Sequence, residues 1–186
     1  MARITAEAAG GRDVTAFLDM LAYSEGTSTG LDNGYGVIVT GVDGPESFTD
    51  YSNHPFFSRP AKLIVAPGPR FPNGLRSTAS GRYQLLFRYF VYYKAELHLP
   101  DFSPLSQDLI AIEQMKERGS LAHLRSGEID KAIAAHITPP DLEDAIEEDA
   151  AIWASLPGNT YGQGGHSMAA LVEKYEDIWS KSFISA

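Results

Sequence analysis

The sequence predicts an α+β fold in which a small antiparallel β-lobe is inserted into a larger helical lobe. A run with helical spacing of apolar residues comes before residue 26. Short β-branched and aromatic runs, bounded by Gly, Pro, Asp and Asn, then fall between residues 34 and 67. Helical signals dominate from residue 82 onward. This order of helix, strands and helices is typical of an α+β domain, and a cleft between two such lobes is a natural ligand site.

The N-terminal part of the chain predicts one helix after a flexible arm. Residues 1–12 are expected to form the arm, and residues 13–186 a single domain. Asp13 is a suitable N-cap, and Gly26 lies where a left-handed residue would end the helix after Glu25. Glu25 lies on an apolar stripe of this helix, which is formed by Phe17, Leu18, Leu21 and Ala22.

The β-lobe is expected at about residues 34–67. Its predicted strands are "GYGVIVTG", "SFTDYS" and "KLIVAPG". A loop rich in Pro and Gly follows, and a helix is expected from "RYQLLFRYFVYYKAEL".

Further helices follow this one. Ser103 and Pro104 predict a cap and first turn, and Gly119 a stop. Shorter helical pieces are expected around 120–125 and 128–136, then a helix from Asp141 towards Pro157 and a last one near 167–183. The acidic side of the Asp141 helix, which includes Asp149, predicts a solvated face.

The composition excludes several classes of function. A net charge of −9 over 186 residues argues against nucleic-acid binding and against stable association with an anionic membrane. The absence of cysteine excludes disulfides and thiolate chemistry. The five histidines show no zinc spacing, so we expect no metal and no cofactor. No GxSxG motif is present, and the Gly-x-Gly of "GYGVIVTG" opens a strand-like run rather than a helix.

Glu25 is the strongest candidate for chemistry. The C-terminal end of a helix and an apolar setting both disfavour an ionised carboxyl, which is what a general acid requires. The commoner alternative is a glutamate at the rim of the core, paired with a distant lysine or arginine.

Two other stretches have residues suited to a ligand. In "STASGRYQLL", small residues precede Tyr83 and Gln84, whose ring, hydroxyl and amide suit a sugar; an ordinary helix start is the alternative. In "SLPGNTYGQGG", a glycine-rich loop carries Tyr161 and Gln163; a plain connector is the alternative.

Several long blocks resemble the endolysin family of bacteriophage lambda and its relatives. They occur in the family's order over roughly residues 14–165: "FLDMLAYSEGT", "YGVIVTG", "FTDYSNHP", "GRYQLL", "DFSPLSQDLIAIEQMKERG" and "IWASLPGNTYGQ". The resemblance implies a lysozyme-like fold and a lytic transglycosylase that cuts the MurNAc–GlcNAc β-1,4 bond of peptidoglycan strands, leaving 1,6-anhydro-MurNAc.

The resemblance also implies site residues. The block "YSEGT" gives the role of catalytic acid to Glu25. Substrate contacts are expected from residues of the matching blocks: Ser24, Tyr35, Asp50, Tyr51, Tyr83, Gln84, Tyr161 and Gln163.

Two other functions stay open. A hydrolytic muramidase would use a second carboxylate, Asp32, Asp43 or Asp50, although "LDNG" and "VDGP" are ordinary turn sequences. A non-catalytic glycan-binding or virion structural module is the other alternative.

The resemblance implies the cellular route as well. A phage endolysin would collect in the host cytoplasm and reach the periplasm through a holin. A monomer is expected because the sequence shows no sustained heptad seam or other clear interface signal. Two segments look longer than in the family, residues 59–78 and 136–151, and the first is expected to alter the rim of the cleft.

Overall fold

The computed structural model describes residues 1–125, 139–158 and 165–182. The chain divides into two compact units, Met1–Gly26 with Ala111–Ala186, and Thr27–Ile110. Helix α4, Pro104–Arg118, continues from the second unit into the first. The first unit is helical and the second combines small sheets with helices, so the predicted α+β class is confirmed. None of the described helices is long and apolar enough to cross a membrane.

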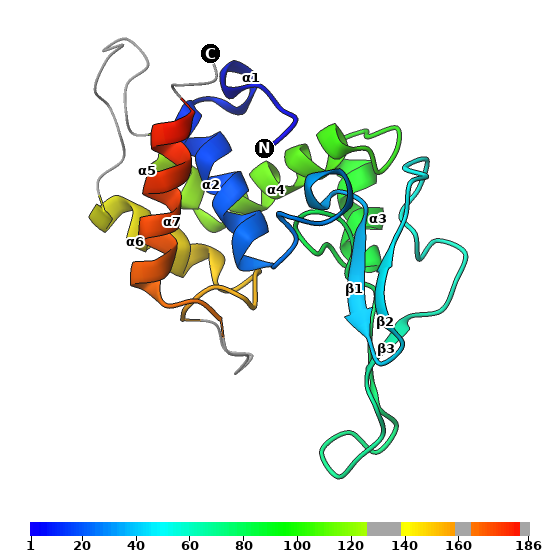
Figure 1. Ribbon diagram of the computed structural model, residues 1–186. Coiled ribbons are helices and arrows are strands. Elements are labelled where there is room, and N and C mark those ends of the chain that lie inside the picture. The colour runs from blue at the N-terminus through cyan, green and yellow to red at the C-terminus, as the bar shows by residue number, and fades with distance from the viewer. Residues whose placement is uncertain (126–138, 159–164, 183–186) are drawn as a thin grey trace. The chain divides into compact units, whose positions relative to one another are not determined.

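The helical unit is built around α2, Arg12–Ser24. Helix α7, Met168–Lys181, lies alongside α2 (Figure 1). Their contact is apolar, with Phe17, Leu18 and Leu21 of α2 and Leu171 of α7 completely buried. Each such side chain contributes roughly 1.5–3 kcal/mol by leaving water. At one end of this pair the hydroxyl of Tyr175 donates to Asp13 Oδ1 at 2.6 Å.

Three shorter helices complete the described part of this unit. They are α1, Ala6–Ala9; α5, Ser120–Arg125; and α6, Pro139–Asp149. Helix α6 ends earlier than predicted because the chain turns after Asp149, and the turn buries Trp153 and Leu156. The helical piece expected at 128–136 lies outside the described residues.

The structure differs from the prediction that residues 1–12 form a flexible arm. Thr5 caps α1 by accepting from the Ala8 N–H at 3.2 Å, and Gly10 ends the helix at φ 91°. Ile4 and Ala9 are buried, so residues 1–12 pack as part of the unit. The N-cap of α2 is Gly11, and Asp13 lies two residues further on, in the first turn, where it binds Tyr175.

The second unit contains two antiparallel strand pairs. Strand β1, Val37–Gly41, pairs with β2, Gly44–Ser47, and β3, Lys62–Val65, pairs with β4, Leu75–Ser77. Residues 48–52, predicted as a strand, are not in one, and β4 lies in the segment predicted as a loop. The β-lobe therefore extends beyond residue 67.

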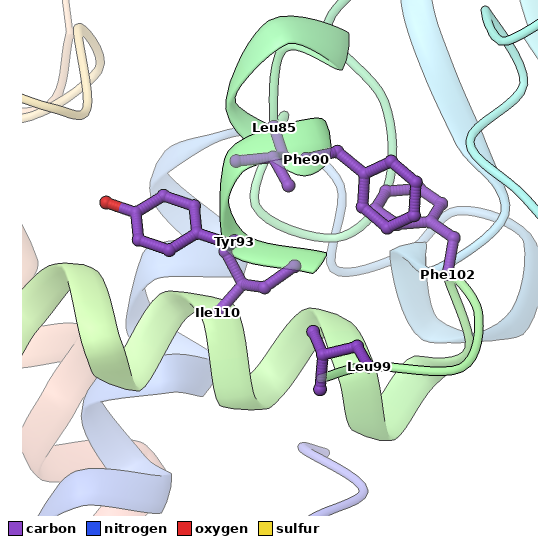
Figure 2. Close-up of a cluster of buried hydrophobic side chains, with 6 residues drawn as sticks. All are labelled: Leu85, Phe90, Tyr93, Leu99, Phe102 and Ile110. Carbon is purple, nitrogen blue, oxygen red and sulfur yellow. The ribbon is translucent and has the colours of Figure 1, made fainter. Parts of the chain in front are cut away.

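The second unit also contains a hydrophobic core with several aromatic rings. It joins helix α3, Phe87–Glu96, to the first turns of α4 through Leu85, Phe90, Tyr93, Leu99, Phe102 and Ile110 (Figure 2). His54 packs against the Phe102 ring at 4.7 Å and bonds the Leu85 carbonyl through Nε2 at 3.1 Å. Burial lowers the pKa of His54 to about 4, so its imidazole is neutral.

Candidate active site

Glu25 is the C-cap of α2, directly after the last helical residue. Its N–H donates to the Leu21 carbonyl at 2.9 Å, and Gly26 follows at φ +70°. Glycine adopts this left-handed backbone conformation without strain, and the left-handed residue ends the helix at the glutamate. The predicted position of Glu25 at the end of an apolar helix is confirmed.

Two serine hydroxyls connect to the Glu25 carboxyl. The Ser155 hydroxyl donates to Glu25 Oε1 at 2.7 Å, and the Ser24 hydroxyl donates to Ser155 Oγ at 2.9 Å. Ser24 is only 8% exposed, so its hydroxyl is used inside the unit. No lysine or arginine of the described residues forms an ion pair with Glu25. This differs from the alternative in which Glu25 lies at the rim of the core and pairs with a basic residue.

The surroundings of Glu25 favour its protonated form. Burial raises the pKa of the carboxyl, and the hydrogen bonds from Ser155 oppose this rise without cancelling it. The carbonyl end of α2 acts in the same direction as burial. Glu25 thus has the protonation behaviour of a general acid.

Aromatic and basic groups lie on the same unit beside this site. The ring of Tyr23 stacks on His166 with centroids 4.6 Å apart. Lys174 Nζ lies 5.0 Å from the centre of the Tyr23 ring. These contacts join the end of α2 to the start of α7 and the residues before it.

Gln84 lies in a tight loop of the second unit rather than in a helix. Its φ is 50°, and its Nε2 donates to the Gly81 carbonyl at 3.0 Å. Residues 82–86 are therefore not helical, and α3 begins at Phe87. The side chain is half-buried, and the strained backbone is the kind found at ligand sites.

Buried polar groups fix this loop. Gln107 Oε1 accepts from the Arg82 N–H at 2.9 Å, and the Thr27 hydroxyl donates to the Arg82 carbonyl at 2.6 Å. Gly81, at φ +80°, packs against the Gln107 amide, where a Cβ would meet Gln107 Cδ at 2.8 Å. The loop is held from both sides, so the position of Gln84 is well defined.

Tyr35 and Tyr83, which were predicted to contact the substrate, have their hydroxyls bound inside the second unit. Both hydroxyls donate to Asp108 Oδ1 at 2.7 Å, inside the second unit. Tyr35 is fully buried and Tyr83 is 5% exposed. A ring that stacks on a sugar must present a face, so these tyrosines hold the loop and α4 together instead.

The aspartates proposed as a second carboxylate each have a local structural partner. Asp50 accepts from the Ser52 N–H at 2.9 Å, and these bonds lower the pKa of its exposed carboxyl. The Tyr51 hydroxyl donates to Asp32 Oδ2 at 3.1 Å. Asp43 Oδ1 lies 3.3 Å from Lys62 Nζ. Asp50 is the one that is exposed without an ion pair in the described chain.

Tyr161 and Gln163 lie outside the described residues. Their roles as substrate contacts stay predictions. Within the described part of the chain, no group of three or more His, Asp or Glu side chains is arranged to hold a metal ion.

Sequence reasoning missed Ser155 as a partner of Glu25. The two residues are 130 positions apart, and a serine after an alanine carries no motif. The available signal was its place at the start of "SLPGNTYGQGG", the stretch already selected as a candidate loop. Gln107 and Asp108, which fix the Gln84 loop, were missed for the same reason.

Comparisons with known proteins agree with this architecture. The family model described as Endolysin matches residues 15–181. The endolysin of Escherichia phage P2 is 49% identical over 166 residues, which cover 87% of this chain and 89% of that protein. The endolysin of Escherichia phage lambda is 43% identical over 166 residues, covering 87% and 88% respectively.

Solved structures give the same result for the fold. Bacteriophage lambda lysozyme complexed with a chitohexasaccharide aligns with a TM-score of 0.70 and 42% identity, covering 96% of this chain and 97% of that one. A second lambda lysozyme structure aligns with a TM-score of 0.67 and 41% identity over the same shares. The expected lysozyme-like fold is confirmed, and the chain belongs to the endolysin family, the lysozyme-like enzymes of phage-induced cell lysis.

Proposed function

We propose that this endolysin is a lytic transglycosylase that cleaves the MurNAc–GlcNAc β-1,4 bond of peptidoglycan, with Glu25 as the acid and then the base. The observation that carries the proposal is the setting of Glu25. Its carboxyl is held at a helix end by a serine hydroxyl, with its pKa raised by burial. The related lambda lysozyme was solved complexed with a chitohexasaccharide, which supports an oligosaccharide as the ligand.

The reaction needs one proton carrier. Protonated Glu25 gives its proton to the glycosidic oxygen as the C1–O bond breaks, and the GlcNAc product leaves with a free O4 hydroxyl. The C6 hydroxyl of the same muramic acid then attacks C1, and Glu25 takes the proton from that hydroxyl. A C1–O6 bond replaces the broken one, no water is consumed, and Glu25 is protonated again.

An internal nucleophile explains why one carboxylate suffices. A hydrolase must activate water, normally with a second carboxylate about 5–5.5 Å or about 6.5–9.5 Å from the first. The C6 hydroxyl belongs to the substrate, so its effective concentration is high without a second protein group. Asp32 and Asp43 each have a structural partner, which is consistent with a mechanism that uses no second carboxylate.

A hydrolytic muramidase is the second candidate, and Asp50 is the residue that favours it. Asp50 is exposed, and its lowered pKa keeps it ionised as a base would need to be. The alternative role of Asp50 is structural: it accepts a hydrogen bond from the Ser52 N–H, as aspartates in turns commonly do.

Two variants test the proposal together. Outer-membrane-permeabilised Gram-negative cells are treated with wild type, Glu25→Gln and Asp50→Asn, and turbidity is followed. The proposal predicts that Glu25→Gln clears the cells at least about 10²-fold more slowly, the usual contribution of a general acid. Asp50→Asn should stay within a fewfold of wild type.

The opposite results identify the alternatives. Equal clearing by wild type and Glu25→Gln contradicts the role of Glu25. A loss in Asp50→Asn as deep as that in Glu25→Gln supports the muramidase. No clearing by well-folded wild type points to the non-catalytic module. The proposed route, from the host cytoplasm through a holin as a monomer, is separate from these outcomes.

A further inference from the structure

Ser155 and Ser24 form a hydroxyl chain that ends on one particular oxygen of Glu25. We propose that Ser155, oriented by Ser24, is a positioning residue that keeps the catalytic proton on Glu25 Oε2. This inference rests on the proposed role of Glu25 as the acid and deepens it by assigning the two carboxyl oxygens.

The direction of the hydrogen bonds carries the argument. A neutral carboxyl has one oxygen with a proton and one that only accepts. Glu25 Oε1 accepts from the Ser155 hydroxyl at 2.7 Å, so the proton of the neutral acid lies on Oε2. The reverse bond, from Glu25 to Ser155, would bind the proton inside the unit, where the glycosidic oxygen cannot receive it.

Ser24 makes the favourable direction the stable one. Its hydroxyl donates to Ser155 Oγ at 2.9 Å, which occupies an acceptor site of Ser155 and turns the Ser155 proton towards Glu25. Hydroxyls in a chain polarise one another, so the two bonds strengthen together. Ser24 directly precedes Glu25 on the buried end of α2.

The backbone of Ser155 is also fixed. A Cβ at Gly165 would come within 2.9 Å of the Ser155 carbonyl carbon, so the chain passes there at backbone contact distance. The next residue, His166, stacks on Tyr23 of α2. These contacts place the Ser155 hydroxyl as a fixed part of the site.

The same bond has a second effect after proton transfer. A hydroxyl bond to a carboxylate is stronger than one to a neutral acid, so Ser155 stabilises the ionised form. Without the Ser155 hydroxyl the pKa of Glu25 rises further, because only the backbone hydrogen bond from residue 155 then opposes the effect of burial. Activity of a general acid is lost as the pH rises through its pKa, so the alkaline limb of the pH profile moves to higher pH.

Other titratable groups on the same unit lie near the end of α2. Among the described residues they include Tyr23, and the His166 and Lys174 that contact its ring. The serine variants leave all three in place. A shift of the alkaline limb is then attributable to Glu25 and its hydroxyl partner.

The test compares Ser155→Ala, Ser155→Thr and Ser24→Ala with wild type. Turnover and KM on soluble glycan strands of fixed length are measured across pH. In Ser155→Ala we expect kcat to fall about tenfold to a hundredfold, as for loss of a hydrogen bond to a charged group, with KM within about twofold. Its alkaline limb should move to higher pH.

Two further variants keep the test independent of folding. Ser155→Thr retains the hydroxyl and should recover most of kcat and the wild-type limb. Ser24→Ala leaves Ser155 in place and should give a smaller loss with a shift in the same direction. Ser180→Ala, which removes an exposed hydroxyl of α7 that donates only to the Asp177 carbonyl, is the matched control and should equal wild type.

An unshifted limb in both Ser155→Ala and Ser24→Ala overturns the inference, as does a Ser155→Thr variant no better than Ser155→Ala. Failure of the proposed function looks different. There Glu25→Gln would itself remain active, whereas an inactive Glu25→Gln beside a fully active Ser155→Ala overturns only the inference about the serines.

Discussion

The positions of some site residues follow from the local sequence, whereas the positions and partners of others depend on contacts with distant parts of the chain. The position of Glu25 follows from an apolar stripe and a glycine within a few residues, so the sequence predicts it. Its partner Ser155 is 130 positions away and leaves no local pattern. Tyr83 has a side chain suited to a sugar, but Asp108 takes its hydroxyl into the core, and only the fold reveals this.

Gln84 gives a test at the residue scale. If its amide contacts the sugar, Gln84→Ala should lower turnover on purified peptidoglycan by about tenfold, the equivalent of one hydrogen bond, while the protein remains folded. Gln84→Gly is the matched control for the backbone, because glycine adopts φ 50° without strain but also lacks the amide.

Both Gln84 variants should therefore lose activity to a similar extent. A Gln84→Gly enzyme as active as wild type would show that the amide is dispensable. Unchanged turnover in Gln84→Ala would reject the predicted contact outright.

Helices and strands differ in how far the sequence predicts them. Helices α4 and α7 were predicted closely because caps and breakers are local, as with Ser103 and Gly119 around α4. Strand β4 and the loop before α3 are not predicted, because contacts with other segments fix them. Strand β4 pairs with β3, and in the loop Ser80 pairs with Ile38 while Gln107 holds Arg82.

Helix α6 contains a second element-level correction. Its acidic side was predicted to be solvated, but Asp149 is fully buried. The Ser120 hydroxyl at the start of α5 donates to Asp149 Oδ1 at 2.9 Å, while Oδ2 has no hydrogen-bond partner among the described residues. Burial raises the pKa of Asp149 to about 7.

This raised pKa predicts a pH-dependent stability difference. The folded state binds the Asp149 proton more tightly than the unfolded state does. The contribution of this proton to the free energy of unfolding is therefore complete below about pH 4 and is lost as the pH rises to about 7. Asp149→Asn cannot ionise and still accepts from Ser120. Urea unfolding should show the variant gaining on wild type across this range, by about 1–4 kcal/mol at pH 7.

Asp144→Asn, on the exposed side of α6, is the control and should follow wild type at every pH. A wild-type minus Asp149→Asn difference that stays constant from pH 4 to 7 would contradict the raised pKa.

At the scale of the whole molecule, the helix, sheet and helix order of the sequence corresponds to two units. The chain leaves the helical unit directly after Glu25 and Gly26 and returns to it within α4. The acid and its serines belong to the helical unit, and Gln84 belongs to the other. The sequence predicts a β-lobe only at about residues 34–67, whereas the second unit runs from Thr27 to Ile110 and includes α3. The core contacts that join α3 to this unit depend on packing, which the local sequence does not reveal.

The products test the central claim for the whole enzyme. Purified peptidoglycan is digested with wild type and with Glu25→Gln, and the released muropeptides are analysed by mass spectrometry. A transglycosylase predicts 1,6-anhydro-MurNAc ends, each one water lighter than a reducing end, from wild type and almost none from Glu25→Gln. Reducing muramic ends from wild type would contradict the account and establish a hydrolase.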